Sequence, residues 1–320
     1  MAARILVTGS SGFVGGALGR WLREHEGAHV TGLSRTPPRE GACDERVAHD
    51  LALGAPFLPA YDAIVHCAAL AAPWAKPAAY ERANIDGLRH MLAYARRVGT
   101  GRFVFLSSSA VHYVFDDQLD LTEETPLPKP INLYAASKQR GETMVRDSGL
   151  DWTIVRPRAV FGPGDTVVFP HILRAAKIGA LPRLARKDGA APRADLLYID
   201  NLSFFLARVL ERSASGVFNL TNGEPIEIPA MLDSLFDRLG LARPTRQVSV
   251  STALAAAGAM EFVSKTFQDW REPKATRFGV ASLAFSRTFD IARARRELGE
   301  PPVPIDEGME RFIAWQRPRL

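Results

Sequence analysis

The chain has 320 residues, of which 47% are hydrophobic and 23% charged, as in an ordinary globular protein with room for two lobes. Its 40 basic and 35 acidic residues give a formal charge of +5, but the basic residues are scattered, so we expect no nucleic-acid partner. Cys43 and Cys67 are too few for a disulfide framework or a metal site. No signal-peptide pattern and no membrane-length apolar run is seen, which predicts a cytoplasmic protein without a membrane span.

The first predicted elements are a strand, a tight turn and a helix. Residues Arg4 to Val7 suit a buried parallel strand, and glycines follow in the pattern Gly-x-x-Gly-x-x-Gly, one residue longer than the usual dinucleotide fingerprint. Glycines also mark ordinary turns, but between a strand and a helix they favour a nucleotide: Gly9 reverses the chain, Gly12 admits a pyrophosphate and Gly15 brings the helix close to the sheet. The helix N-terminus then offers free N–H groups to the anion. The residues expected at the cofactor are Gly9, Gly12, Phe13, Val14 and Gly15.

The second predicted strand, over 29–33, ends at Ser34 and Arg35. Dinucleotide-binding folds contact the adenosine ribose at this place, about 20 residues beyond the glycines. A carboxylate there would bind the ribose hydroxyls and repel a 2′-phosphate, whereas the planar Arg35 guanidinium suits a phosphate. We therefore favour NADP(H) as the cofactor, with NAD(H) as the alternative; an Arg35 that only points into solvent is the competing interpretation.

Two further strands are predicted over 46–49 and 63–67. After the first, Asp50 could accept a hydrogen bond from the adenine amino group while Leu51 packs on the ring. An Asp that merely begins a turn is an equal alternative. After the second strand come Ala68 and Ala69, small residues that would let the backbone pass close to the cofactor.

The candidate catalytic residues follow a strand predicted over 103–106. Its end carries a run of serines, and Tyr134 and Lys138 are four residues apart, so they share one face of a helix. A phenol with an ordinary pKa near 10 is a poor acid or base at neutral pH, but a neighbouring ammonium lowers that pKa. Lys138 would also bind the nicotinamide ribose, while a serine hydroxyl holds the substrate oxygen. The set suits proton transfer that accompanies hydride transfer.

Strands alternate with helices up to a further strand over 152–156, which predicts an α/β fold with a doubly wound parallel sheet of the Rossmann type. Strands are also predicted over 196–199 and 217–220, with a helix over 202–211 between them, and both are expected to return to the main sheet. The expected domains are therefore a dinucleotide-binding domain, 1–165, rejoined by 194–225, and a smaller, mostly helical substrate-binding lobe in 166–320.

Four motifs in this order carry a family resemblance: the glycine loop, Ser107-Ser108-x-x-Val111, Tyr134-x-x-x-Lys138 and Arg156-Pro157-x-x-x-Phe161-Gly162-Pro163-Gly164. They resemble the extended short-chain dehydrogenase/reductases over nearly the whole chain. The resemblance implies that Ser108 is the catalytic serine, with Ser109 as a close rival, because His112 stands where the family usually has Tyr. It also implies that Pro157 and Val160 lie at the cofactor. A homodimer is a further expectation from the resemblance.

Motifs in 197–202, 218–223 and 289–299 resemble the 3β-hydroxysteroid dehydrogenase-like branch, which includes bacterial 2-alkyl-3-oxoalkanoate reductases. That resemblance implies NADP(H)-dependent interconversion of a ketone and a secondary alcohol on a small or lipophilic substrate. Ser109-Ala110 stands where the 4,6-dehydratases carry Asp-Glu, which argues against dehydration. An NAD-dependent sugar-nucleotide epimerase and a non-catalytic dinucleotide-sensing protein are the alternatives.

Overall fold

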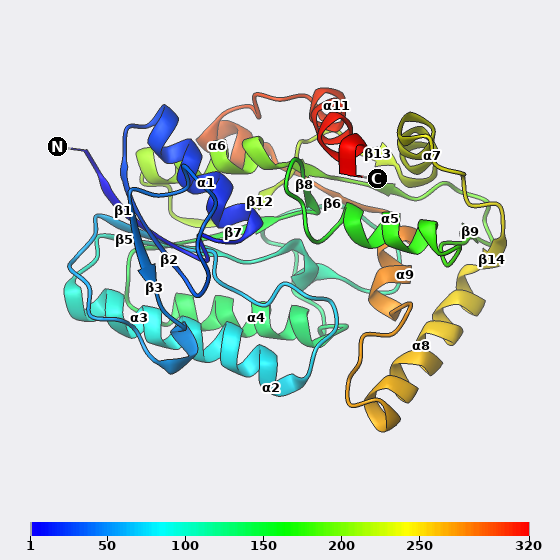
Figure 1. Ribbon diagram of the computed structural model, residues 1–320, viewed down its shortest axis with the longest axis horizontal. Helices are drawn as coiled ribbons and strands as arrows, with labels where there is room; N and C mark the ends of the chain where they lie inside the picture. Colours follow the sequence, from blue (N-terminus) through cyan, green and yellow to red (C-terminus); the bar gives the residue numbers. More distant parts are fainter. Residues whose placement is uncertain (1, 320) are drawn as a thin grey trace.

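The computed structural model describes residues 2–319 and contains a large parallel sheet beside a smaller lobe (Figure 1). The large sheet has seven strands, all parallel, in the order β12-β7-β5-β4-β1-β2-β3. Their bounds, in chain order, are β1 (Arg4–Thr8), β2 (His29–Ser34), β3 (Glu45–Ala48), β4 (Ala63–His66), β5 (Arg102–Leu106), β7 (Trp152–Pro157) and β12 (Gly216–Leu220). This arrangement confirms the predicted doubly wound sheet.

Helices cover both faces of this sheet (Figure 1). On one face lie α1 (Phe13–His25) and α6 (Ile199–Glu211), which pack against each other; on the other lie α2 (Pro77–Tyr80), α3 (Gly87–Val98) and α4 (Leu133–Arg146). The strands between the two layers are buried, with Leu6, Val65 and Val104 each 0% exposed. Burial on both faces explains why these strands read as continuous apolar runs.

The smaller lobe is mixed, with short strands as well as helices. Its sheets are β13 (Ile226–Glu227), β10 (Arg193–Ala194), β15 (Arg287–Phe289) and β6 (Gln118–Leu121), in that order; β11 (Leu197–Tyr198) with β8 (Val160–Phe161); and β14 (Gln247–Ser249) with β9 (Arg183–Ala185). The other helices are α5 (Phe169–Lys177), α7 (Ile228–Leu239), α8 (Val250–Phe267), α9 (Arg277–Ala284), α10 (Ala292–Leu298) and α11 (Ile305–Gln316).

One strand expected in the main sheet lies elsewhere. The prediction over 217–220 is confirmed, since β12 pairs with β7 at the edge of the main sheet. The prediction over 196–199 is wrong about the partner, because β11 pairs with β8 in a separate two-stranded sheet. The Asn222 side chain accepts a hydrogen bond from the backbone N–H of Tyr198 at 2.9 Å, and Ile199 already begins α6. A side-chain hydrogen bond to a residue 24 positions away thus holds the end of this segment.

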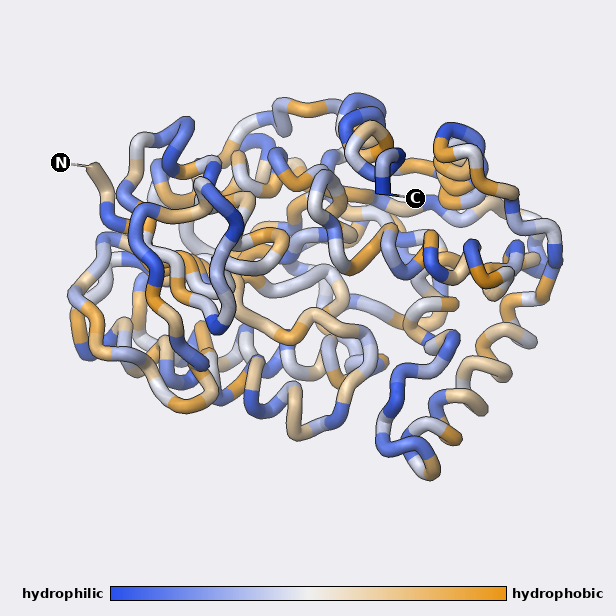
Figure 2. The backbone as a smooth tube through the Cα atoms, viewed as in Figure 1, coloured by the Kyte–Doolittle hydropathy of each residue, from blue (hydrophilic) through white to orange (hydrophobic). Residues whose placement is uncertain are grey.

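Helix α8 extends from the smaller lobe and is largely hydrophobic (Figures 1 and 2). The last turn of α8 and the segment that follows it contact the large lobe: Trp74 Nε1 donates to Ser264 Oγ at 3.2 Å, and Lys76 pairs with Asp269 at 2.6 Å. Trp74 and Trp270 also contact, with ring centres 5.4 Å apart. These contacts join the smaller lobe to the large lobe outside the main sheet. Within residues 2–319, no helix is long and apolar enough to cross a membrane.

Candidate active site

The glycine loop lies between the end of β1 and the start of α1. Gly9 has a φ of +68°, and a Cβ there would lie 2.9 Å from the backbone of Ala68. A Cβ on Gly15 would lie 2.4 Å from the carbonyl oxygen of Gly9. Both positions therefore need glycine, for the turn and for the close approach of helix and loop. Gly12 is exposed, and its N–H donates to the Gly9 carbonyl at 2.9 Å.

Helix α1 begins directly after this loop without a capping side chain. Gly12 is its N-cap, no side chain caps the first turn, and Phe13 and Val14, which open the helix, are half-buried. A 13-residue helix with an uncapped N-terminus presents N–H groups and a partial positive charge. The tight glycine turn and this helix end fit the diphosphate of a dinucleotide.

Arg35 and Asp50 follow β2 and β3 at the expected adenosine end of the site. Arg35 is exposed, and within residues 2–319 no hydrogen bond or ion pair holds its guanidinium. Asp50 accepts from the Ala52 N–H at 3.1 Å and so caps a short 3₁₀ turn, in keeping with the alternative that it begins a turn. A hydrogen bond from Arg82 at 2.8 Å lowers the pKa of Asp50, and the charge of Arg35 adds to this.

Leu51, Ala68 and Ala69 complete the residues expected around the cofactor in this half. Leu51 is only 7% exposed and packs in the core, which leaves little of its side chain for an adenine ring. Ala68 and Ala69 follow β4, and the Ala68 N–H donates to Thr8 Oγ1 at 3.1 Å. The fold therefore brings the small residues after β4 against the glycine loop.

The structure distinguishes between the two candidate serines. The Ser108 side chain lies close enough to the Tyr134 phenol to act on its pKa, in the lowering direction. Ser108 also accepts from the Ala110 N–H at 3.2 Å, at the start of a 3₁₀ turn. Ser109 lies within that turn and is 2% exposed. Of the two, Ser108 is the one that meets the phenol.

Lys138 lies one turn beyond Tyr134 on α4 but is directed elsewhere. Its ammonium donates to the Leu106 carbonyl at 2.6 Å and lies 5.0 Å from the centre of the Phe105 ring. Burial lowers the pKa of Lys138 to about 8. Burial also raises the pKa of Tyr134, although the Ser108 side chain opposes this. The expected lowering of the Tyr134 pKa by Lys138 is therefore not seen, because the ammonium is bonded to a backbone carbonyl instead.

A buried ion pair that the sequence interpretation missed supports these residues. Glu142, 0% exposed and one turn beyond Lys138 on α4, accepts from Arg156 Nε at 2.8 Å and Nη2 at 2.7 Å. It also accepts from Ser107 Oγ at 2.6 Å. Burial raises the pKa of Glu142, but these hydrogen bonds outweigh it and leave the pKa below its usual value. The pair joins the end of β7, the helix of Tyr134 and the serine next to Ser108. The spacing of Glu142 from Lys138 places both residues on the same face of α4. This spacing was the sequence feature that could have indicated a buried carboxylate there.

Asn84 is a second residue whose contacts were missed. It lies in a π-helical turn, Glu81–Asp86, between α2 and α3. Its Nδ2 donates to Ser137 Oγ at 2.8 Å, and its Oδ1 accepts from the Leu70 N–H at 2.6 Å. Asn84 thus ties α4, between Tyr134 and Lys138, to the loop after β4. Periodicity predicts a helix here but not its widened turn.

Pro157 and Val160 lie where β7 ends and β8 begins. Pro157 is buried, Val160 is half-buried, and Ala159 between them has a φ of +41°. Both residues therefore reach the carboxyl edge of the sheet that also carries Ser108. Arg158, between them, is 6% exposed and lies over the Tyr113 ring at 5.2 Å.

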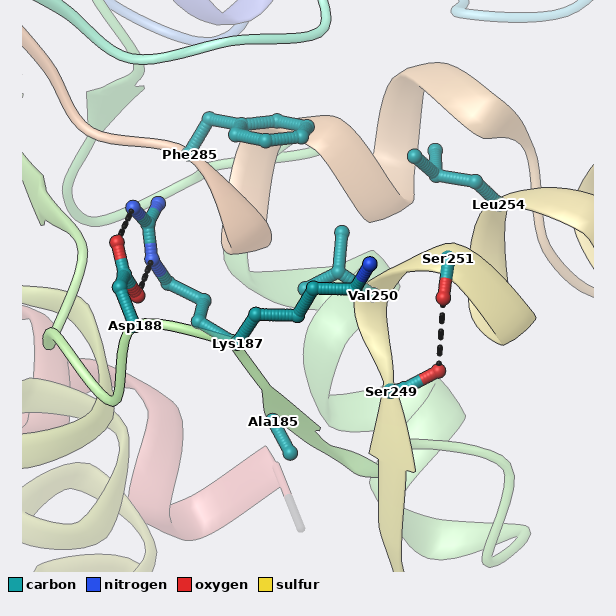
Figure 3. Close-up of a pocket in the computed structure, with 9 residues that line it drawn as sticks. Ala185, Lys187, Asp188, Ser249, Val250, Ser251, Leu254 and Phe285 are labelled. Carbon is teal, nitrogen blue, oxygen red and sulfur yellow. Dashed lines mark hydrogen bonds and ion pairs between the residues drawn. The ribbon is translucent and has the colours of Figure 1, made fainter.

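A separate hollow of about 350 Å³ lies in the smaller lobe (Figure 3). Residues of β9, β14 and the start of α8 line it, and Arg186 pairs with Asp188 at its rim at 2.6 Å. None of the predicted catalytic or cofactor residues lines it. The hollow is therefore distinct from the site at the edge of the main sheet.

The glycine loop and the Ser108–Tyr134 pair at the carboxyl edge of one parallel sheet define an NAD(P)-dependent oxidoreductase of the extended short-chain type. The comparisons agree: the chain belongs to the NAD dependent epimerase/dehydratase family, whose model matches residues 5–221. This confirms both the resemblance and the expectation of an enzyme that uses a dinucleotide.

Individual relatives are similar over most of their length. The 2-alkyl-3-oxoalkanoate reductase of Stenotrophomonas maltophilia (strain K279a) is 31% identical, with 97% of this chain and 98% of that protein covered. A 4-hydroxy-2-methyl-3-oxo-4-farnesyl-3,4-dihydroquinoline-1-oxide ketoreductase of Stigmatella aurantiaca is 29% identical, with 92% and 91% covered. The crystal structure of the Thermus thermophilus UDP-glucose 4-epimerase with NAD matches with a TM-score of 0.73 at 23% identity, covering 99% of this chain and 100% of that one, and so supports the fold.

Proposed function

We propose that this protein interconverts a ketone and a secondary alcohol, with NADP(H) preferred over NAD(H). The observation that carries the proposal is the Ser108 side chain beside Tyr134 at the carboxyl edge of the main sheet, where it acts to lower the pKa of the phenol. When bound, the nicotinamide coenzyme supplies or accepts a hydride. The protein must then hold the carbonyl oxygen and move one proton to or from it.

Tyr134 is the proton donor in the reducing direction. The phenol carries its proton at neutral pH; burial raises its pKa and makes it a weaker acid, and the Ser108 side chain opposes that effect. Ser108, beside this phenol, orients the substrate oxygen. Lys138 holds a cation one helical turn away and, in this proposal, binds the nicotinamide ribose. Asn84 and Glu142 position α4, which carries Tyr134 and Lys138.

The coenzyme is held at two places in this proposal. The glycine loop and the N-terminus of α1 hold the diphosphate, and Arg35 pairs with the 2′-phosphate of NADP(H). An exposed guanidinium without an ion pair at the end of β2 supports this choice. The names of the two relatives support a ketone as the substrate and a small or lipophilic molecule as its class.

Arg35→Gln tests the coenzyme preference. We expect the unaltered protein to bind NADPH more tightly than NADH, and the variant to lose about tenfold or more in NADPH affinity, because a charge-assisted hydrogen bond is lost. NADH affinity should change much less. Arg174→Gln, an exposed arginine on α5, is the matched control. Fluorescence titration of both coenzymes measures this, and equal affinities in the unaltered protein would contradict the NADP(H) preference.

A further inference from the structure

Two buried arginines lie against one aromatic ring beside the candidate site. The guanidinium carbon of Arg287 lies 3.8 Å from the centre of the Tyr113 ring, and that of Arg158 lies 5.2 Å from it. Arg287 is 0% and Arg158 6% exposed. Arg158 follows the last residue of β7, whereas Arg287 begins β15 in the smaller lobe. Each lobe therefore contributes one cation to the same place.

Neither guanidinium forms an ion pair within the described part of the chain. Arg287 donates from Nε to Gln118 Oε1 at 3.0 Å and from Nη2 to the Val114 carbonyl at 3.0 Å. Its Nη1 is buried and has no hydrogen-bond partner, and the same holds for Arg158 Nε. No hydrogen bond to residues 2–319 uses the Arg158 side chain. Buried donors are normally satisfied, so these two are unusual.

The nearby carboxyl group can balance at most one of the two cations. Asp195 is 0% exposed, and burial raises its pKa to about 6, although the charge of Arg158 opposes this. One of its oxygens accepts from the Phe289 N–H at 2.8 Å, and the other has no partner. Burial lowers the pKa of Arg287, and repulsion from Arg158 adds to that lowering, whereas Tyr113 and Asp117 oppose it. An excess of buried positive charge is costly unless an anion compensates it.

The ring that both arginines contact also contacts the catalytic region. Tyr113 packs in one small cluster with Ala110 and Ala135, against which Tyr134 and Phe278 also pack. Electrostatic interaction with Tyr113 is one of the influences that raise the pKa of Tyr134. A negatively charged group held by Arg158 would therefore lie beside the Tyr134 phenol, which exchanges a proton with the reacting carbonyl.

We propose that Arg158, with Arg287 behind it, binds a carboxylate carried by the substrate. This inference rests on the proposed function, since it describes the part of the substrate next to the reacting carbon. A planar guanidinium with free donors matches a carboxylate in a bidentate manner, and the unpartnered Nε of Arg158 supplies one such donor. The name of the 2-alkyl-3-oxoalkanoate reductase gives a substrate of this kind, a ketone that bears a carboxylate.

The test compares an acid and its ester as substrates of the same enzyme. 3-Hydroxyoctanoate and methyl 3-hydroxyoctanoate are oxidised with NADP⁺, each giving the 3-oxo product, NADPH and a proton. We expect Arg158→Gln to lower kcat/KM for the acid about 10- to 100-fold more than for the ester, because charge-assisted hydrogen bonds to the carboxylate are lost. Arg158→Lys should restore part of the difference. Arg97→Gln is the matched control, since Arg97 lies over the Tyr94 ring at 5.8 Å on α3.

Several outcomes would overturn the inference. Equal losses for acid and ester would make Arg158 structural, and a parallel loss of NADPH affinity would assign it to the coenzyme. If the unaltered protein oxidises neither compound, the proposed function fails for this substrate class, and octanoate binding decides the inference separately. A rise in melting temperature with octanoate in the unaltered protein, absent in Arg158→Gln, supports the carboxylate site; the same rise in both, or none in either, contradicts it.

Discussion

The coenzyme half and the substrate half of the site are built in different ways. The coenzyme half depends on backbone: Gly9 and Gly15 permit a turn and a helix approach that any Cβ would block. The substrate half depends on side chains from distant segments, such as Arg158 and Arg287, which meet at Tyr113. Backbone requirements appear in a sequence as glycines at fixed spacing, whereas side-chain encounters across lobes leave no local pattern. The comparison therefore predicts that the two halves fail in different ways when altered.

Glu142→Gln acts where the two halves meet and should have the largest effect on stability. Removing the carboxylate leaves Arg156 as a buried charge with weaker partners, which costs about 3–5 kcal/mol of unfolding free energy. Glu81→Gln is the matched control, because Glu81 pairs with Arg140 at 2.6 Å on the surface and should cost at most about 1 kcal/mol. Denaturant unfolding of both variants measures the difference, and similar losses would contradict the role of the buried pair.

The same pair sets a pH dependence with a definite sign. The pKa of Glu142 in the folded protein lies below its ordinary value of 4.5, so its carboxylate stabilises the fold above that pH. This stabilisation is lost as the pH falls through the lower, folded pKa. The stability gap between the unaltered protein and Glu142→Gln should therefore narrow below pH 4.5. A gap that widens on acidification would contradict this assignment.

Gly15→Ala tests the backbone half and should have a smaller effect on stability. The added Cβ would lie 2.4 Å from the Gly9 carbonyl oxygen, so loop and helix must shift, at a cost of about 1–3 kcal/mol. The shift should also weaken binding of both coenzymes together, unlike Arg35→Gln. Gly87→Ala is the matched control, since its Cβ would meet Leu51 at an ordinary 3.4 Å. Coenzyme titration checks this, and unchanged affinity in Gly15→Ala would show that the loop does not hold the coenzyme.

The sequence predicted the large sheet well because its strands are apolar runs bounded by turns. The glycine loop and the Tyr134–Lys138 spacing followed from local rules of the same kind. The pairing of the segment around Tyr198 could not be predicted, because its contacts with the Asn222 side chain and with β8 come from residues distant in the sequence. The lowering of the Tyr134 pKa was also wrong, since burial and the bond from Lys138 to a carbonyl depend on packing.

The central claim is that Tyr134 moves the proton while the coenzyme is held independently at the opening loop. Tyr134→Phe, with Tyr61→Phe as the control, tests it most directly through NADPH titration and single-turnover reduction of one ketone by the same preparations. We predict unchanged NADPH affinity and a rate lowered about 10²- to 10⁴-fold in Tyr134→Phe alone. A rate within a few fold of the unaltered protein, or an equal loss in Tyr61→Phe, would contradict the account.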